Sequence, residues 1–87
     1  MDTIATMHPD YLKALEGSRL PNGATILEIE YDNANLMGIV FARSSGFQPW
    51  VTWEFYRGDL ASTSCGHYFS NLVEAALDFQ ERTKKIH

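Results

Sequence analysis

The chain has 87 residues, of which 45% are apolar and 13% aromatic, and its formal net charge is −4. A chain of this length and apolar content supports one hydrophobic core, so we expect residues 1–87 to form a single domain, with residues 1–7 flexible. A negative net charge repels phosphate groups, which makes nucleic acid an unfavourable partner.

The first expected element is a short helix that begins near Pro9 and closes at Gly17. Proline is favoured at the first helical position, and glycine suits the left-handed residue that follows the last turn. Tyr11, Leu12 and Leu15 form one apolar stripe at helical spacing. We therefore expect this stripe to be the buried side of the helix.

Two strands are expected next, over residues 24–31 and 36–43. In the first strand, apolar residues alternate with glutamates: Leu27, Ile29 and Tyr31 oppose Glu28 and Glu30. Such alternation is typical of a half-buried strand. The second strand is more continuously apolar, which indicates a central position in the sheet.

The clearest strand covers residues 50–56. Its alternation defines two sets of side chains, Val51, Trp53 and Phe55 on one face and Trp50, Thr52, Glu54 and Tyr56 on the other. A charged group is less costly at a hydrated surface than in a core. We therefore expect the wholly apolar set to face the helices and the set that contains Glu54 to face outward.

A weaker strand over residues 61–69 is expected at an edge of the sheet, because its serines and glycine have little to pack. A final helix follows, with Asn71 as N-cap and Glu74 placed to complete a capping box. Its apolar line of Leu72, Ala76 and Phe79 is expected to pack on the sheet.

The order of elements and their short connections predict an α+β fold. We expect an antiparallel four-stranded β-meander flanked by an N-terminal and a C-terminal helix, with both helices covering one face of the sheet. A double-stranded-RNA-binding domain has a broadly similar topology, so nucleic-acid binding is the alternative function. That domain needs basic residues at the start of its final helix. Asn71 and Glu74 stand there instead.

Cys65 and His67 are two positions apart on a strand, so they project from the same face and suit a nucleophile–base pair or half of a metal site. Zinc needs three or four ligands, and no further ligand is suitably placed. We therefore expect no catalytic residue, no metal and no cofactor, and do not expect an enzyme.

The location of the protein is constrained by the same cysteine and by the apolar runs. Cys65 is the single cysteine, and no Asn-x-Ser/Thr glycosylation site is present. The longest mostly apolar run, residues 36–42, is far shorter than a membrane span. These features predict a cytoplasmic protein that does not contact a membrane.

Residues 51–82 carry three segments that resemble a known group of proteins. The segments are Val51-Thr52-Trp53, Gly66-His67-Tyr68-Phe69, and a helix with Glu74, Ala75, Asp78, Phe79 and Arg82. The pattern resembles small uncharacterised bacterial proteins from phage, plasmid or conjugative-element settings. Many of these carry an aromatic residue where this chain has Cys65. The resemblance implies no activity, because that group has no assigned function.

The outward-facing aromatic residues are the best candidates for a binding site. Trp and Tyr side chains give much contact area at low entropic cost. We therefore expect Trp50, Tyr56 and Tyr68, with Glu54, to bind a protein partner or a second copy of the chain. The predicted function is a non-enzymatic interaction module, with an accessory or inhibitory role in a phage or other mobile element.

Overall fold

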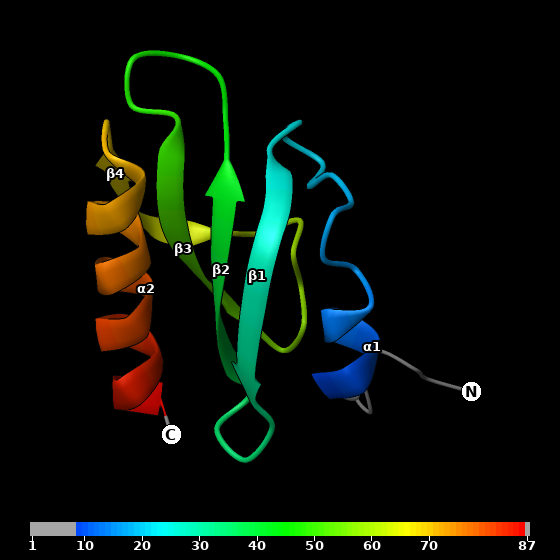
Figure 1. Ribbon diagram of the computed structural model, residues 1–87. Coiled ribbons are helices and arrows are strands. Elements are labelled where there is room, and N and C mark those ends of the chain that lie inside the picture. The colour runs from blue at the N-terminus through cyan, green and yellow to red at the C-terminus, as the bar shows by residue number, and fades with distance from the viewer. Residues whose placement is uncertain (1–8, 87) are drawn as a thin grey trace.

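The computed structural model describes residues 9–86 (Figure 1), so the prediction that residues 1–7 are flexible lies outside the described residues. The elements are α1 (Pro9–Lys13), β1 (Thr25–Asp32), β2 (Met37–Arg43), β3 (Trp50–Tyr56), β4 (Ser64–Phe69) and α2 (Leu72–Ile86). The strands form one antiparallel four-stranded sheet in the order β1-β2-β3-β4. The predicted α+β meander between two helices is therefore confirmed.

The two helices lie on opposite sides of the sheet, as Figure 1 shows, so the expectation that both cover one face is wrong. The reason is visible in β2, whose two faces are both apolar and both buried. Val40 and Ala42 belong to the core on the α1 side, and Ile39 and Phe41 to the core on the α2 side. A sheet that is apolar on both faces needs a cover on each.

The larger core lies on the α1 side of the sheet. It contains the buried residues Leu12, Leu20, Ala24, Ile26, Ile29, Tyr31, Val40, Ala42, Val51, Trp53 and Phe55. Tyr31 and Phe55 stack across the sheet with their ring centroids 5.6 Å apart. Gly38 permits this stack, because a Cβ atom there would lie 2.8 Å from the Tyr31 ring.

The smaller core joins α2 to the other face of the sheet. Its buried residues are Ile39, Phe41, Ala75, Phe79 and Ile86, and the rings of Phe41 and Phe79 lie 5.7 Å apart. The buried stripe of α2 is Ala75, Phe79, Arg82 and Ile86. Phe79 is buried as predicted, whereas Leu72 is 47% exposed. The stripe is rotated from the predicted line because it includes Arg82, whose partners lie beneath the helix.

A β-bulge interrupts the predicted alternation of β1. The register with β2 shifts between Ile26 and Glu28, so Ile26 is buried and Leu27 is 38% exposed. The expectation that Leu27 lies in the core is therefore wrong, because the bulge places an extra residue in the strand. Ile29 and Tyr31, which follow the bulge, are buried as expected.

The predicted N-cap of α2 is confirmed, whereas α1 ends at Lys13, earlier than the predicted close at Gly17. Asn71 caps α2 through its Oδ1 atom, which accepts hydrogen bonds from the backbone N–H groups of Val73 at 2.7 Å and Glu74 at 3.2 Å. Gly17 has a φ angle of 93° after the turn that follows α1. Tyr11 is 56% exposed, so it does not join Leu12 in the core. Within residues 9–86, no helix is long and apolar enough to cross a membrane.

Candidate functional site

The face of β3 that carries Trp50, Thr52, Glu54 and Tyr56 lies under α2, so the expectation that this face is open is wrong. Thr52 is fully buried, and Trp50 packs partly buried against the smaller core. Tyr56, at the end of the strand, remains 46% exposed. The wholly apolar set of Val51, Trp53 and Phe55 faces the α1 side instead.

Arg82 accounts for the position of α2 over the polar side chains of β3. Its Nη1 group donates to the Thr52 backbone oxygen at 3.1 Å and to Thr52 Oγ1 at 2.9 Å. Its Nη2 group donates to Glu54 Oε2 at 3.1 Å. Arg82 is only 7% exposed. A buried guanidinium is tolerated because these acceptors replace its water.

Asp78, one turn before Arg82, connects the same network to β4. Its Oδ2 atom accepts from Thr52 Oγ1 at 2.6 Å and lies 2.9 Å from His67 Nδ1. The carboxylate can only accept, so the His67 Nδ1–H group donates to it. His67 is thereby held on the α2 side of β4.

Glu54 is the acidic residue of the network that pairs with Arg82. Tyr56 OH donates to its Oε1 atom at 2.7 Å. Burial opposes ionisation of Glu54, but hydrogen bonds from Tyr56, Arg82 and Cys65, together with the charge of Arg82, lower the pKa of its carboxyl below the usual value. Glu54 is therefore the counterion of Arg82.

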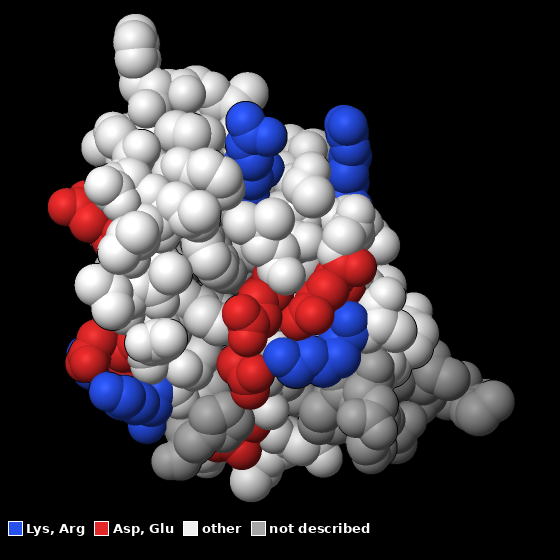
Figure 2. All heavy atoms as spheres, in the orientation of Figure 1, with Lys and Arg blue, Asp and Glu red and all other residues white. Residues whose placement is uncertain are grey.

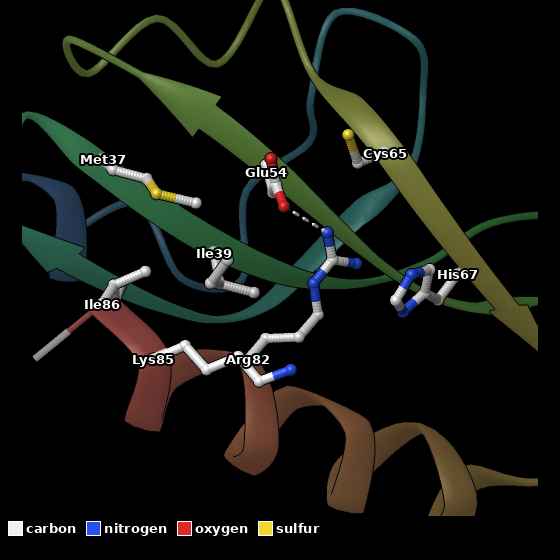
Figure 3. A pocket seen from close by; sticks show the side chains of 8 residues that line it. All are labelled: Met37, Ile39, Glu54, Cys65, His67, Arg82, Lys85 and Ile86. Atoms are coloured by element: carbon white, nitrogen blue, oxygen red, sulfur yellow. Dashed lines mark hydrogen bonds and ion pairs between the residues drawn. The ribbon is translucent and has the colours of Figure 1, made fainter.

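A pocket of about 370 Å³ opens beside this network, and Figure 3 shows its lining side chains converging from the sheet and from α2. It is lined by Met37, Ile39, Glu54, Cys65, His67, Arg82, Lys85 and Ile86. Cys65 and His67 both reach it, as their spacing predicted. Within residues 9–86, no group of three or more His, Cys, Asp or Glu side chains could hold a metal ion.

Strand β4 is the other notable feature, because it forms an edge of the sheet as predicted. Its first five residues, Ser64–Tyr68, are exposed, and the strand contains no Asp, Glu, Lys or Arg. Among residues 9–86, no backbone segment pairs with its outer side. Tyr68 is 49% exposed and packs edge-on against Trp53, with ring centroids 6.0 Å apart.

A bulge also shapes β4. The register with β3 shifts so that His67 opposes Thr52 while Ser64 opposes Glu54. Cys65 adopts a φ angle of 54° at this point. At Gly66 a Cβ atom would lie 2.7 Å from Trp53 Nε1, so the strand approaches the indole ring closely. Beyond the bulge, the consecutive residues His67 and Tyr68 project from opposite faces of the strand.

The opposite edge of the sheet, β1, is protected. Its Ile26 exchanges backbone hydrogen bonds with the preceding segment, accepting from Gly17 N at 2.7 Å and donating to Ser18 O at 2.8 Å. Further along, the Ile29 N–H group donates to Glu16 Oε2 at 2.9 Å. Edge strands are normally protected in this way, by a covering segment or by charge. Strand β4 has neither protection within the described chain.

Charged side chains are distributed unevenly between the two edges. Acidic residues gather near β1 in Figure 2, where Lys13 lies 2.8 Å from Glu30 and 3.4 Å from Glu16. Lys and Arg side chains are scattered over the face shown and form no continuous basic surface. Strands β1 and β4 are the two edges of the sheet, so the uncharged edge at β4 lies opposite the acidic edge at β1.

Comparisons of this chain with models of protein families, with curated proteins and with solved structures find no match. The candidate site is therefore defined by the geometry of the chain itself. The resemblance of residues 51–82 to small mobile-element proteins stays a prediction.

Thr52, Asp78 and Arg82 are the site residues that the sequence reasoning missed. The pattern that could have found them is the helical spacing of Ala75, Phe79 and Arg82, which places a cation on the buried stripe of α2. A buried cation requires acceptors on the opposing face. In β3, the set that contains Thr52 and Glu54 supplies them.

Proposed function

We propose that this protein is a non-enzymatic protein-interaction module that binds its partner along the edge of β4. The observation that carries the proposal is the contrast between the two edges of the sheet. Strand β1 is covered and flanked by charge, whereas β4 is exposed and uncharged. An edge that is neither covered nor charged is a template for main-chain pairing with another strand, here interrupted only by the bulge near Cys65.

Strand addition would give both affinity and selectivity at this edge. The main-chain hydrogen bonds supply affinity. Side chains on the two faces of the added strand contact the neighbouring surfaces and so supply selectivity. On one face the neighbour is Tyr68, which remains half exposed beside Trp53. On the other face the neighbours are His67 and the pocket. The partner is therefore expected to present an extended segment.

The four residues predicted as a binding surface take different parts in this proposal. Tyr68 lies on the binding edge itself. Tyr56 and Glu54 form a hydrogen-bonded pair at the end of β3 that borders the pocket. Trp50 packs against the smaller core beside Phe69 and supports the end of β4. The proposed surface is thus an edge instead of an open aromatic face.

The paired side chains of Arg82, Glu54 and Asp78 favour a structural role over a catalytic one for these three groups. Arg82 and Glu54 pair with each other, and Asp78 accepts from Thr52 and His67. A catalytic acid or base needs a free lone pair or proton directed at a substrate. An accessory or inhibitory role in a mobile element is the setting that the resemblance of residues 51–82 suggests.

A peptide-display experiment tests the proposal. Random extended peptides are selected against the protein, and the bound peptides are mapped by amide hydrogen exchange. We expect binders to protect the amides of β4 and to bind at least tenfold more weakly to the Ser64→Lys/Ser70→Lys variant, which introduces charge at both ends of the edge.

The matched control is the Ser45→Lys/Gln80→Lys variant, which changes the net charge equally at exposed positions of the β2–β3 connection and of α2. It should bind the same peptides as the unsubstituted protein. Peptides that protect residues elsewhere, or that bind both variants equally, would show that β4 is not a binding edge.

A further inference from the structure

We infer that the pocket beside α2 binds a small organic acid, whose carboxylate lies between Arg82 and Lys85 and whose apolar body contacts the apolar side of the pocket. This site goes beyond the proposed function, which concerns main-chain pairing along β4. The pocket has a volume of about 370 Å³. Sites for small molecules typically have this size, and they combine apolar walls with a few polar groups that fix the orientation of the ligand.

Arg82 has a hydrogen-bond donor that its own chain does not use. All its hydrogen bonds leave from the Nη1 and Nη2 groups, and in the described part of the chain its Nε–H group donates to no acceptor. No fully buried side-chain nitrogen or oxygen of the described residues lacks a hydrogen-bond partner, so Nε is not sealed from solvent. Arg82 is only 7% exposed and lines the pocket, so the pocket gives a ligand access to this N–H group.

Lys85 supplies a second cation at the same place. It follows Arg82 by three positions, so both side chains leave the same side of α2, and Figure 3 shows both at the pocket. Among residues 9–86, Lys85 forms no ion pair, whereas its neighbour Lys84 lies 3.6 Å from Glu81. A carboxylate has two acceptor oxygens, so it can accept from the guanidinium and from the ammonium group together.

The charge of the pocket favours an anion, although the whole chain carries −4. Arg82 and Lys85 are positive, and Glu54 is the one acidic residue of the lining, so the lining has a net positive charge when His67 is neutral. The Glu54 carboxylate already accepts from Arg82 on one oxygen and from Tyr56 on the other. Its charge is therefore partly neutralised, and Lys85 is left to attract a second carboxylate.

The apolar side of the pocket determines what the rest of the ligand must be. It is formed by Met37, Ile39 and Ile86. Ile39 and Ile86 belong to the smaller core, so their side chains hold fixed positions. An apolar ligand body that contacts them displaces water from apolar surface, which is favourable. The expected ligand is therefore a monocarboxylate that is apolar apart from its acid group.

Titration with octanoate tests this inference, followed by NMR of protein labelled at the methyl groups of isoleucine and methionine. We expect saturable shifts of the Met37, Ile39 and Ile86 signals. Lys85→Gln should weaken binding about tenfold, because it removes a charged donor. The matched control is Lys84→Gln, which removes the same charge from an adjacent exposed position outside the pocket and should keep the original affinity.

Two further measurements separate the parts of the ligand. 1-Octanol, which has the same body without a carboxylate, should bind about tenfold more weakly than octanoate, and acetate should show a similar loss. Cys65, the single cysteine, lines the pocket and reports its occupancy. Octanoate should slow the alkylation of Cys65 by iodoacetamide in the unsubstituted protein and in Lys84→Gln, and much less in Lys85→Gln at the same concentration.

The opposite results would overturn the inference. They are an absence of methyl shifts below the micellar range of octanoate, equal binding of octanoate and 1-octanol, or equal losses in the two lysine variants. If only acidic peptides bound along β4 shift these methyl groups, the carboxylate belongs to a protein partner and the free acid is excluded. Failure of the proposed function is distinguishable, because a protein that binds octanoate in the pocket but no peptide at β4 loses that function and retains this site.

Discussion

Arg82 of α2 and Thr52 of β3 form two hydrogen bonds, from one guanidinium nitrogen to the backbone oxygen and to the hydroxyl oxygen of the threonine. Thr52 is fully buried and Arg82 nearly so. The pair therefore connects the second half of α2 to the middle of the sheet. An apolar side chain in place of Arg82 could not donate a hydrogen bond to the backbone oxygen of Thr52.

Replacing Arg82 with methionine should lower the free energy of unfolding by about 3 kcal/mol, because it leaves Thr52 and the partly buried Glu54 without their cation. Urea unfolding at neutral pH measures the loss. Lys84→Met, at an exposed position of the same helix, is the matched control and should change stability by about 0.5 kcal/mol or less. Equal effects of the two substitutions would contradict a structural role for Arg82.

Phe79→Ala should destabilise the protein by about 3–5 kcal/mol, since Phe79 is 5% exposed and packs against Phe41. The control is Leu77→Ala on the same helix, where the side chain is 57% exposed. We expect its effect to stay within about 0.5 kcal/mol. A loss below about 1 kcal/mol for Phe79→Ala in urea unfolding would show that this side of α2 is not core.

Gly66→Ala should destabilise the protein by about 1–3 kcal/mol, although the backbone of Gly66 requires no positive φ angle. The added methyl group would lie 2.7 Å from Trp53 Nε1 and 2.8 Å from Tyr68 Cε1, so the indole ring must shift. Thermal unfolding and tryptophan fluorescence measure the effect. An unchanged melting temperature and emission spectrum would mean that β4 moves away from Trp53 without cost. Ser70→Ala, at an exposed position just after β4, is the control.

Glu54 should make stability depend on pH in the acidic range. The pKa of Glu54 in the folded protein lies below its ordinary value of 4.5, so the unfolded chain takes up the proton first as the pH falls. The contribution of Glu54 to stability is therefore complete above about pH 4.5 and is lost as the pH falls through the folded pKa. Urea midpoints between pH 7 and pH 3 should fall less steeply for Glu54→Gln than for the unsubstituted protein.

Glu81→Gln provides the comparison for that experiment, because the Glu81 carboxylate is exposed and pairs with Lys84 on the surface. Its pH profile should follow that of the unsubstituted protein. If both variants lose the same part of the pH dependence, the hydrogen bonds to Glu54 do not set the acid sensitivity.

Cys65 and His67 are expected to carry no essential chemistry. Cys65→Ser should leave peptide binding at β4 intact, and His67→Gln retains a donor that can reach Asp78. Elemental analysis of the untagged protein should show no stoichiometric zinc. Stoichiometric metal that is lost with either substitution would reverse this interpretation and make the pocket a metal site.

Local features of the chain were readable from the sequence because their causes are local. The N-cap at Asn71 needs only its own side chain and the next three residues. The bounds of β3 follow from alternation between Pro49 and the turn after Tyr56. Short connections between strands favour antiparallel neighbours, so the meander and the edge position of β4 also followed from the order of elements.

The face that each helix covers was decided only by the tertiary structure. Alternation divides β3 into an apolar set and a set that mixes aromatic and polar side chains, but a period of two does not determine which helix each set contacts. The charge of Glu54 suggested an open face, whereas Arg82 neutralises that charge beneath α2. The spacing of the buried stripe indicates that Arg82 needs acceptors, but residues 54 and 82 are far apart in the sequence, so only packing of the whole chain brings this cation over this acid.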